Sequence, residues 1–411
     1  MPAEPEGTRA MAGARGDLLL RNVRPMGGEP VDLLIQGGRI AAIGTGLDSP
    51  GISIEEGRGA VLIPGLVEAH THLDKNLLGL PWHPHSAGPT LQDRIDNERR
   101  LKRVLGIDPE RQAARQVVLS VANGSTHIRS HVDIDTEHGL WGVEGVLTTR
   151  ERYRDWVDIE LVAFPQSGLL KRPGTLELME KALRLGVDVV GGIDPCTMDR
   201  DPKGHLDAVF GLAQRFGRAV DIHLHEPNEL GLFSLDLIVE RTRALGMAGR
   251  VTVSHAFCLG TNDGLEVGRV LDELAETGVA VMTTGPSGWP APPVQRACAA
   301  GVTVCSGSDG VRDLWHPYGN ADMLDRARLL GERNGMDKDE ELALALAVCT
   351  EGGARAMALS GYGLAVGDDA DLVLVQARNL PEAVVLCPPR QLVLKRGRVV
   401  AREGQATCSA P

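Results

Sequence analysis

Eight short apolar runs alternate with helix-like stretches through the middle of this 411-residue chain. The stretches between them, such as TLELMEKALRLG and LDLIVERTRALG, carry apolar residues at helical spacing and end in glycine. Eight alternations of strand and helix over about 300 residues predict a (β/α)8 barrel of the TIM type. The runs read VLIPGLVEAHTH, GSTHIRSHVDID, DIELVAFPQSG, VDVVGGIDP, AVDIHLHE, RVTVSHAFCL, VAVMTTGPS and VTVCSGSDG.

Both ends of the chain have the pattern of β structure. Residues 17–64 and 365–411 contain short apolar runs separated by glycines, as in VDLLIQGGRIAAIG and RQLVLKRGRVVAREG. We therefore predict one small β-sandwich domain built from both termini, attached to a catalytic barrel over residues 65–364. Residues 1–16, rich in proline, glutamate and glycine, are predicted to be a disordered tail.

Composition narrows the classes of partner. The net charge is −12, from 43 Lys and Arg against 55 Asp and Glu, and aromatic residues make up only 3% of the chain. Both values argue against a nucleic-acid partner, which needs basic and base-stacking surfaces. No apolar run is long enough to cross a membrane, no secretory signal is visible, and the seven cysteines lack CxxC spacing. We expect a cytoplasmic protein that binds a small molecule.

Polar residues, and histidines above all, gather where the apolar runs end. A barrel enzyme carries its chemistry at the carboxyl ends of its strands, so this pattern predicts a catalytic site there. Seven of the twelve histidines occupy such endings, namely His70, His72, His127, His131, His223, His225 and His255.

The spacing of these histidines indicates a metal site. His70 and His72 lie two residues apart, so a strand directs both imidazoles to one face. The fifth run supplies His223 or His225, between which spacing alone does not choose, and the eighth supplies Asp309. Three imidazoles and one carboxylate form a mixed nitrogen and oxygen site that suits one divalent ion. We expect zinc first and iron second.

This arrangement resembles the amidohydrolase superfamily: HxH after the first strand, histidine after the fifth and the sixth, and aspartate after the eighth. Within it, the chain resembles the branch of cytosine deaminase and N-isopropylammelide isopropylaminohydrolase, from about residue 17 to about residue 405. The supporting segments are LIPGLVEAHTHLDK, THIRSHVDID, VAFPQSG, VVGGIDP, DIHLHE, GRVTVSHAFC and SDGVRDLWHPYGNADML.

The resemblance implies one metal ion with the ligands His70, His72, His223 and Asp309. It also implies catalytic roles for Glu226 and His255, and contact between Gln166 and the substrate ring. The fourth run ends in Gly192-Ile193-Asp194-Pro195 without the lysine that bridges two metals in binuclear members.

The chemistry of these groups suits hydrolytic deamination. A bound metal lowers the pKa of water from ~15.7 to about 7. Asp309 can accept the water proton, Glu226 can carry it to a ring nitrogen, and His255 can stabilise the developing tetrahedral centre. Gln166 offers both a donor and an acceptor to a ring NH–C=O edge.

Other residues have a functional and a structural interpretation side by side. Asp194 contacts substrate or caps a helix, and Lys75 reaches the pocket mouth or pairs with Asp74 or another carboxylate. Trp315 forms a wall against the substrate ring or packs in the barrel. His127 and His131 orient the ligands or are structural, while His225 lies at the pocket rim if His223 is the ligand.

We therefore predict metal-dependent deamination of a cytosine-like cyclic amidine, with release of ammonia. The first alternative is an aminohydrolase of N-alkylamino-triazines, because Glu226 fits the deaminase pattern whereas Gly310, GGIDP and SHAFC fit the triazine pattern. The second is a ring-opening cyclic-amide hydrolase. A binding protein on an inactive barrel would lack some of the ligand and acid–base residues, and this chain has them all, which argues against that class. The nucleic-acid cytidine deaminases use HxE and PCxxC motifs that this chain lacks. Barrels of this type often associate, so we expect a homo-oligomer.

Overall fold

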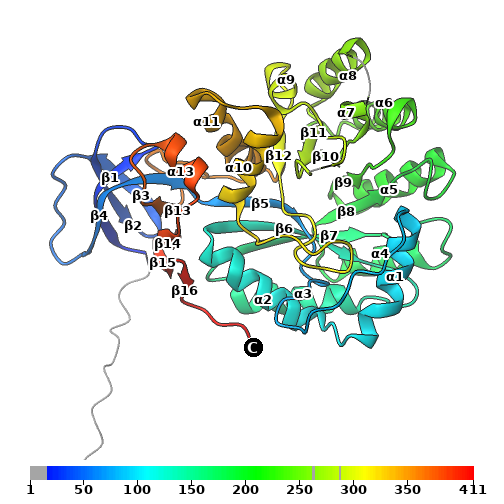
Figure 1. Cartoon of the computed structure of the whole chain (residues 1–411), viewed down its shortest axis with the longest axis horizontal. Coiled ribbons are helices and arrows are strands. Elements are labelled where there is room, and N and C mark those ends of the chain that lie inside the picture. The colour runs from blue at the N-terminus through cyan, green and yellow to red at the C-terminus, as the bar shows by residue number, and fades with distance from the viewer. Residues whose placement is uncertain (1–15, 262–263, 287) are drawn as a thin grey trace, which may run out of the picture.

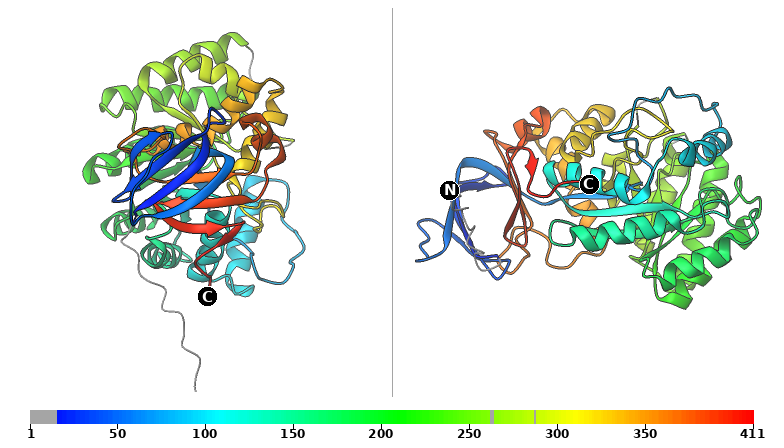
Figure 2. Two further views of the ribbon diagram at one scale, coloured as in Figure 1. Left: turned by 90° about the vertical axis from the view of Figure 1, so that its left-hand side faces the viewer. Right: turned by 90° about the horizontal axis from the view of Figure 1, so that it is seen from below.

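Two eight-stranded sheets form the framework of the computed structural model, which describes residues 16–261, 264–286 and 288–411 (Figure 1). One sheet is the barrel. The other lies at one end of it and contains both terminal segments, as the side views in Figure 2 show. Residues 1–15, most of the predicted tail, lie outside the described residues.

The barrel strands follow one another in chain order, and each is parallel to the next. The ring closes where Thr71 pairs in parallel with Asp309, whose backbone N–H donates to the carbonyl of His70 at 2.9 Å. This confirms the predicted barrel. The strands are β5 (Leu66–Thr71), β6 (Ser125–Asp133), β7 (Asp158–Phe164), β8 (Val189–Ile193), β9 (Ala219–His223), β10 (Val251–Ser254), β11 (Ala280–Thr283) and β12 (Val304–Ser306).

Helices cover the outside of the barrel (Figure 1). Helix α5 shows how the sequence sets their ends: Asp201 accepts from the N–H of Gly204 at 2.9 Å, Pro202 occupies the first turn, and Gly217 ends the helix with a φ of +64°. The helices are α1 (Leu91–Val104), α2 (Pro109–Ala122), α3 (Trp141–Tyr153), α4 (Thr175–Arg184), α5 (Pro202–Phe216), α6 (Asn228–Ala244), α7 (Cys258–Thr261), α8 (Gly264–Thr277), α9 (Val294–Ala299), α10 (Met323–Asn334), α11 (Asp339–Val348), α12 (Glu351–Ala356) and α13 (Leu380–Leu386).

None of the helices within the described ranges has both the length and the apolar character needed to cross a membrane.

The second sheet has the order β16-β15-β14-β13-β4-β1-β2-β3. The long strand β4 joins its two halves, because β4 pairs with β1 over most of its length and with β13 through residues 61–64. Side chains such as Leu20, Leu33, Leu372 and Leu394 form one apolar core from both ends of the chain, which confirms the predicted β-sandwich. The strands are β1 (Leu18–Pro25), β2 (Val31–Gln36), β3 (Arg39–Gly44), β4 (Ser53–Pro64), β13 (Leu372–Val375), β14 (Arg390–Lys395), β15 (Arg398–Arg402) and β16 (Gln405–Ala406).

A cluster of charges around the buried Lys395 joins the two sheets. Lys395 of β14 places its Nζ 2.6 Å from Oδ2 of Asp371 and 2.7 Å from Oδ2 of Asp158, at the start of β7. The same ammonium lies 3.3 Å from Nε2 of His127, near the start of β6. Burial and the charge of Lys395 lower the pKa of His127 to about 4. His127 therefore belongs to the domain junction, at the end of the barrel opposite the predicted site. We propose that the domains divide at residues 64/65 and 364/365.

Candidate active site

Four donor groups from four strands converge at the carboxyl end of the barrel. One nitrogen or oxygen atom of each lies within 4.8 Å of the other three. His72 adjoins this group, with its Nε2 3.2 Å from Oδ1 of Asp309. The structure thus brings the predicted metal ligands together and adds His255 beside them. The group of four, which we call the donor cluster, consists of His70, His223, His255 and Asp309.

The backbone is strained where the strands deliver these residues. His255, directly after β10, has a φ of +72°, and Asp309, after β12, has a φ of +59°. A positive φ costs a residue other than glycine about 1–3 kcal/mol, and such conformations collect at functional sites because the surrounding fold holds them in place.

The donor cluster fits a divalent metal ion. Nε2 of His70, both ring nitrogens of His223 and Nε2 of His255 are buried without a hydrogen-bond partner in the described part of the chain. Burial lowers the pKa of His223 and of His255 well below the usual value, so both imidazoles are neutral and offer lone pairs. Burial alone raises the pKa of Asp309, but the neighbouring imidazoles of His70 and His72 outweigh burial and hold that pKa well below its usual range. Buried, unpartnered nitrogens beside a carboxylate are the donors that zinc or ferrous iron takes.

A hydrogen-bond chain sets the tautomer of His70. Its Nδ1 lies 2.9 Å from Oγ of Ser254, and that hydroxyl lies 2.6 Å from Oδ1 of Asp221. Because a carboxylate only accepts, the hydroxyl donates to Asp221 and accepts from Nδ1–H of His70. Nε2 of His70 is then left with a free lone pair toward the donor cluster.

His131 offers a second, less favourable grouping. Its ring lies 3.9 Å from that of His70 between centroids, and His70, His131 and Asp221 also bring ligand atoms within 4.8 Å of one another. The carboxylate of Asp221 is already committed, since it accepts from Ser254 and, at 3.0 Å, from Arg129. We therefore favour the donor cluster.

His225 pairs with Asp194 and lies outside the donor cluster. Its Nδ1 is 2.8 Å from Oδ2 of Asp194, and its ring stacks on that of His255 at 4.7 Å between centroids. Burial opposes protonation, but the charge and hydrogen bond of Asp194 outweigh burial and raise the pKa of His225. Asp194 does not cap α5, which Asp201 caps.

Glu226 is buried and faces Thr197 and Ser234. Its Oε1 accepts from the backbone N–H of Thr197 at 2.7 Å, and its Oε2 accepts from Oγ of Ser234. Burial raises its pKa, although these hydrogen bonds act against the rise. A carboxyl group with a raised pKa suits a proton carrier.

Three predicted substrate contacts meet in one buried network. Lys75 donates from Nζ to Oε1 of Gln166 at 2.6 Å and lies 3.1 Å from both carboxylate oxygens of Asp133. Glu98 of α1 accepts from Nε2 of Gln166 at 3.2 Å and from the indole N–H of Trp315. Lys75 thus pairs with Asp133 and, at 3.3 Å, with Glu98, while Asp74 pairs with Lys102 at 2.7 Å. We call Lys75, Glu98, Asp133, Gln166 and Trp315 the recognition cluster.

Sequence reasoning missed Glu98 and did not single out Asp133. Asp133 ends the second apolar run, so the rule that polar strand endings carry function could have found it. Glu98 lies on a helix rich in charged residues, and the signal that could have found it is its position three residues from both Ile95 and Leu101, on the apolar face of that helix.

The comparison with known proteins agrees with this geometry. A sequence profile described as "Amidohydrolase family" matches residues 57–405. This protein belongs to the amidohydrolase family. Its sequence is 31% identical over 396 residues to N-isopropylammelide isopropyl amidohydrolase of Pseudomonas sp. (strain ADP), covering 94% of this chain and 98% of the relative.

Two solved amidohydrolase structures are similar over nearly their whole length. N-isopropylammelide isopropylaminohydrolase from Burkholderia multivorans is 50% identical, with a TM-score of 0.92 over 95% of this chain and 99% of that chain. The 5-methylcytosine deaminase from Klebsiella pneumoniae, liganded with 5-fluorocytosine, is 29% identical, with a TM-score of 0.82 over 93% of this chain and 97% of that chain.

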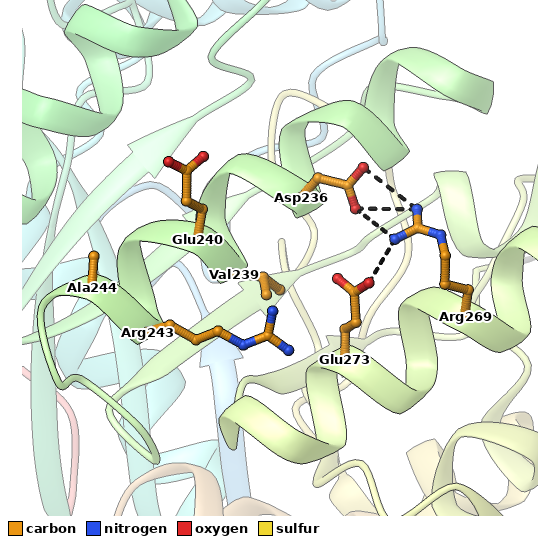
Figure 3. Close-up of a pocket in the computed structure, with 7 residues that line it drawn as sticks. All are labelled: Asp236, Val239, Glu240, Arg243, Ala244, Arg269 and Glu273. Carbon is orange, nitrogen blue, oxygen red and sulfur yellow. Dashed lines mark hydrogen bonds and ion pairs between the residues drawn. The ribbon is translucent and has the colours of Figure 1, made fainter.

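The amidohydrolase also has a hollow on its outer surface, between α6 and α8 (Figure 3). Three of its charged side chains pair with one another: Arg269 lies 3.2 Å from Asp236 and 2.8 Å from Glu273. This hollow lies among the outer helices and holds none of the predicted site residues, so we assign it no part in the chemistry.

Proposed function

We propose that this amidohydrolase hydrolyses the exocyclic C–N bond of an amino-substituted N-heterocycle, a cytosine-like cyclic amidine, and releases ammonia. The observation that carries the proposal is the donor cluster, whose buried, unpartnered nitrogens lie beside the carboxylate of Asp309. The ligands we propose are His70, His72, His223 and Asp309. When bound, one divalent ion, zinc or alternatively iron, would supply water with a pKa lowered from ~15.7 to about 7.

The protein groups then move protons and hold the ring. Asp309 takes a proton from the attacking water, whose oxygen forms a bond to the ring carbon. Glu226 delivers a proton to the neighbouring ring nitrogen, and His255 donates a hydrogen bond to the tetrahedral centre. As the C–N bond breaks, the amine leaves with the proton held by Asp309, the hydroxyl proton of the tetrahedral centre returns to Glu226, and the ring remains closed as a lactam.

Glu226→Gln tests the proton carrier. Glutamine keeps the shape: its oxygen can accept from the N–H of Thr197 and its amide nitrogen can donate to Oγ of Ser234, but it carries no transferable proton. Turnover should fall by about 10²–10⁴-fold while metal content and unfolding temperature stay unchanged. Glu229→Gln, an exposed change in the first turn of α6, is the control. Turnover within threefold of the unaltered enzyme would contradict the role and direct attention to His225, which Asp194 holds beside His255.

A second candidate substrate is an N-alkylamino-triazine, which would release an alkylamine. The 50% identity to the Burkholderia multivorans enzyme favours it. An apolar surface also lies beside the site: the ring of Phe257 is 5.6 Å from that of His255, and Trp289 stacks on Phe257 at 5.9 Å. An alkyl group on the departing nitrogen would find this surface next to the acid–base residues. A ring-opening cyclic-amide hydrolase is the third candidate.

A released-amine assay tests these proposals. Zinc-loaded enzyme is incubated with cytosine, isocytosine, 5-methylcytosine, ammelide and N-alkylammelides, and the products are identified by mass. Ammonia with a closed, hydroxylated ring supports deamination, and an alkylamine supports the second candidate. No amine from any compound, with a full metal site, contradicts both. Location in the cytoplasm and association into a homo-oligomer stay predictions from the sequence.

A further inference from the structure

The recognition cluster fixes which hydrogen-bonding group Gln166 can offer to a substrate. An ammonium group only donates, so the atom that faces Lys75 at 2.6 Å must be the amide oxygen, Oε1. The amide nitrogen then faces Oε1 of Glu98 and Oδ2 of Asp133, each at 3.2 Å. Within the described part of the chain, both hydrogens of this amide are committed, which leaves one lone pair of Oε1 free. Sequence reasoning expected a donor and an acceptor from Gln166, whereas the structure leaves an acceptor alone.

Lys75 is committed in the same way. Its three hydrogens are matched by Asp133, by Oε1 of Gln166 and, at 3.3 Å, by Oε2 of Glu98. The indole N–H of Trp315 is also taken, because it donates to Oε2 of Glu98. Glu98 therefore touches Lys75, Gln166 and Trp315, the three residues of the recognition cluster that were predicted to bind substrate. Glu98 itself is only 2% exposed.

The recognition cluster adjoins the donor cluster. Phe164, two residues before Gln166, stacks on His223 with ring centroids 4.0 Å apart. Ile95 of α1, one turn before Glu98, packs in the same apolar group as Phe164 and Trp315. Helix α1 thus brings Glu98 to the carboxyl ends of the barrel strands. Burial and the nearby charge of Asp133 raise the pKa of Glu98, although Lys75 opposes the rise.

We propose that Glu98 is a positioning residue for substrate recognition. It holds Gln166 and Trp315 so that Gln166 offers only its oxygen. The pocket thereby selects heterocycles that present a ring N–H. The inference rests on the proposed function and names the chemical class that the site takes. A ring nitrogen that carries a methyl group, or only a lone pair, at that position is rejected, because neither can donate to Oε1.

Glu98→Gln tests the positioning role. Four groups face residue 98: the amide nitrogen of Gln166, the indole N–H of Trp315 and Nζ of Lys75 are donors, and the carboxylate of Asp133 is an acceptor. The new amide nitrogen meets a donor in either orientation, so the arrangement that orients Gln166 is lost. We expect KM for the ring N–H substrate to rise at least 10-fold, kcat to stay within threefold, and metal content to stay unchanged. Asp96→Asn, the same charge change at an exposed position of α1, is the matched control.

The decisive readout is discrimination between the best substrate and its analogues methylated at each ring N–H in turn. The unaltered holoenzyme should prefer the parent over at least one analogue by 10-fold or more in kcat/KM, and Glu98→Gln should reduce that ratio below threefold. A merely structural role would lower activity on parent and analogue equally, leave the ratio unchanged and overturn the proposal.

Other results are also decisive. If Glu98→Gln does not fold, the methylated analogues assayed with the unaltered enzyme remain as the test. Values of kcat/KM for all these analogues within twofold of the parent would then overturn the proposal. If the unaltered enzyme is active and Glu98→Gln has the same KM, the role of Glu98 is contradicted but the proposed function is not. If the unaltered holoenzyme turns over none of the compounds and binds neither uracil nor cyanuric acid, the proposed function and this inference are both overturned.

Discussion

Asp309→Ala is expected to lower amine release by about 10⁴-fold, the loss typical of a residue on which the whole catalytic group depends. The carboxylate of Asp309 lies 3.2 Å from Nε2 of His72 and 3.6 Å from Nε2 of His70, so its removal takes away both a proposed ligand and the acceptor of the water proton. Metal retention should fall at the same time, measured as metal per chain after dialysis against a chelator.

A second variant separates chemistry from backbone strain. Asp309 has a φ of +59°, which alanine tolerates less well than asparagine. Asp309→Asn should therefore fold normally, yet it should lose turnover because an amide cannot take up the water proton. Asp337→Ala, at an exposed position, is the control. Full metal occupancy with full activity in both Asp309 variants would remove this residue from the site.

Lys395→Met is expected to lower the free energy of unfolding by about 3–5 kcal/mol, because it leaves the buried carboxylate of Asp371 without its cation. The ammonium lies 2.6 Å from Asp371 and 2.7 Å from Asp158, and the lysine side chain is 1% exposed. Urea unfolding of the holoenzyme measures the loss.

The control for this variant is another lysine in an ion pair. Lys203→Met removes an exposed pair with Asp207, and surface pairs contribute about 0–1 kcal/mol. If both variants lose the same stability, the junction between barrel and β-sandwich does not depend on Lys395.

The convergence of the proposed metal ligands could be predicted because their signal is local. A strand places residues two apart on one face, and barrel strands end together, so His70, His72 and Asp309 were expected to meet. The choice between His223 and His225 needed the tertiary structure, since Asp194 holds His225 away from the donor cluster. The ligand assignment itself stays a prediction that the Asp309 variants test.

Other residues were beyond the reach of local patterns. The second run continues through nine strand residues, so His127 lies near the start of β6 and at the opposite end of the barrel from the site. The partner of Lys75 proved to be Asp133, 58 residues away, and not the adjacent Asp74. Glu98 lies on the buried face of α1, three residues from both Ile95 and Leu101, but this spacing does not report that its partners are Gln166 and Trp315. In all three cases the partners of the residue lie far away in the sequence, and the spacing of residues along one segment does not identify them.

The most direct test of the central claim is turnover in ¹⁸O-labelled water. The zinc-loaded enzyme is given the best substrate of the released-amine assay, and amine and ring product are weighed together. We predict one ¹⁸O atom in a closed ring for each amine released, and no turnover after the metal is removed. A ring-opened product, or amine release without ¹⁸O in the ring, would contradict hydrolysis of the exocyclic C–N bond.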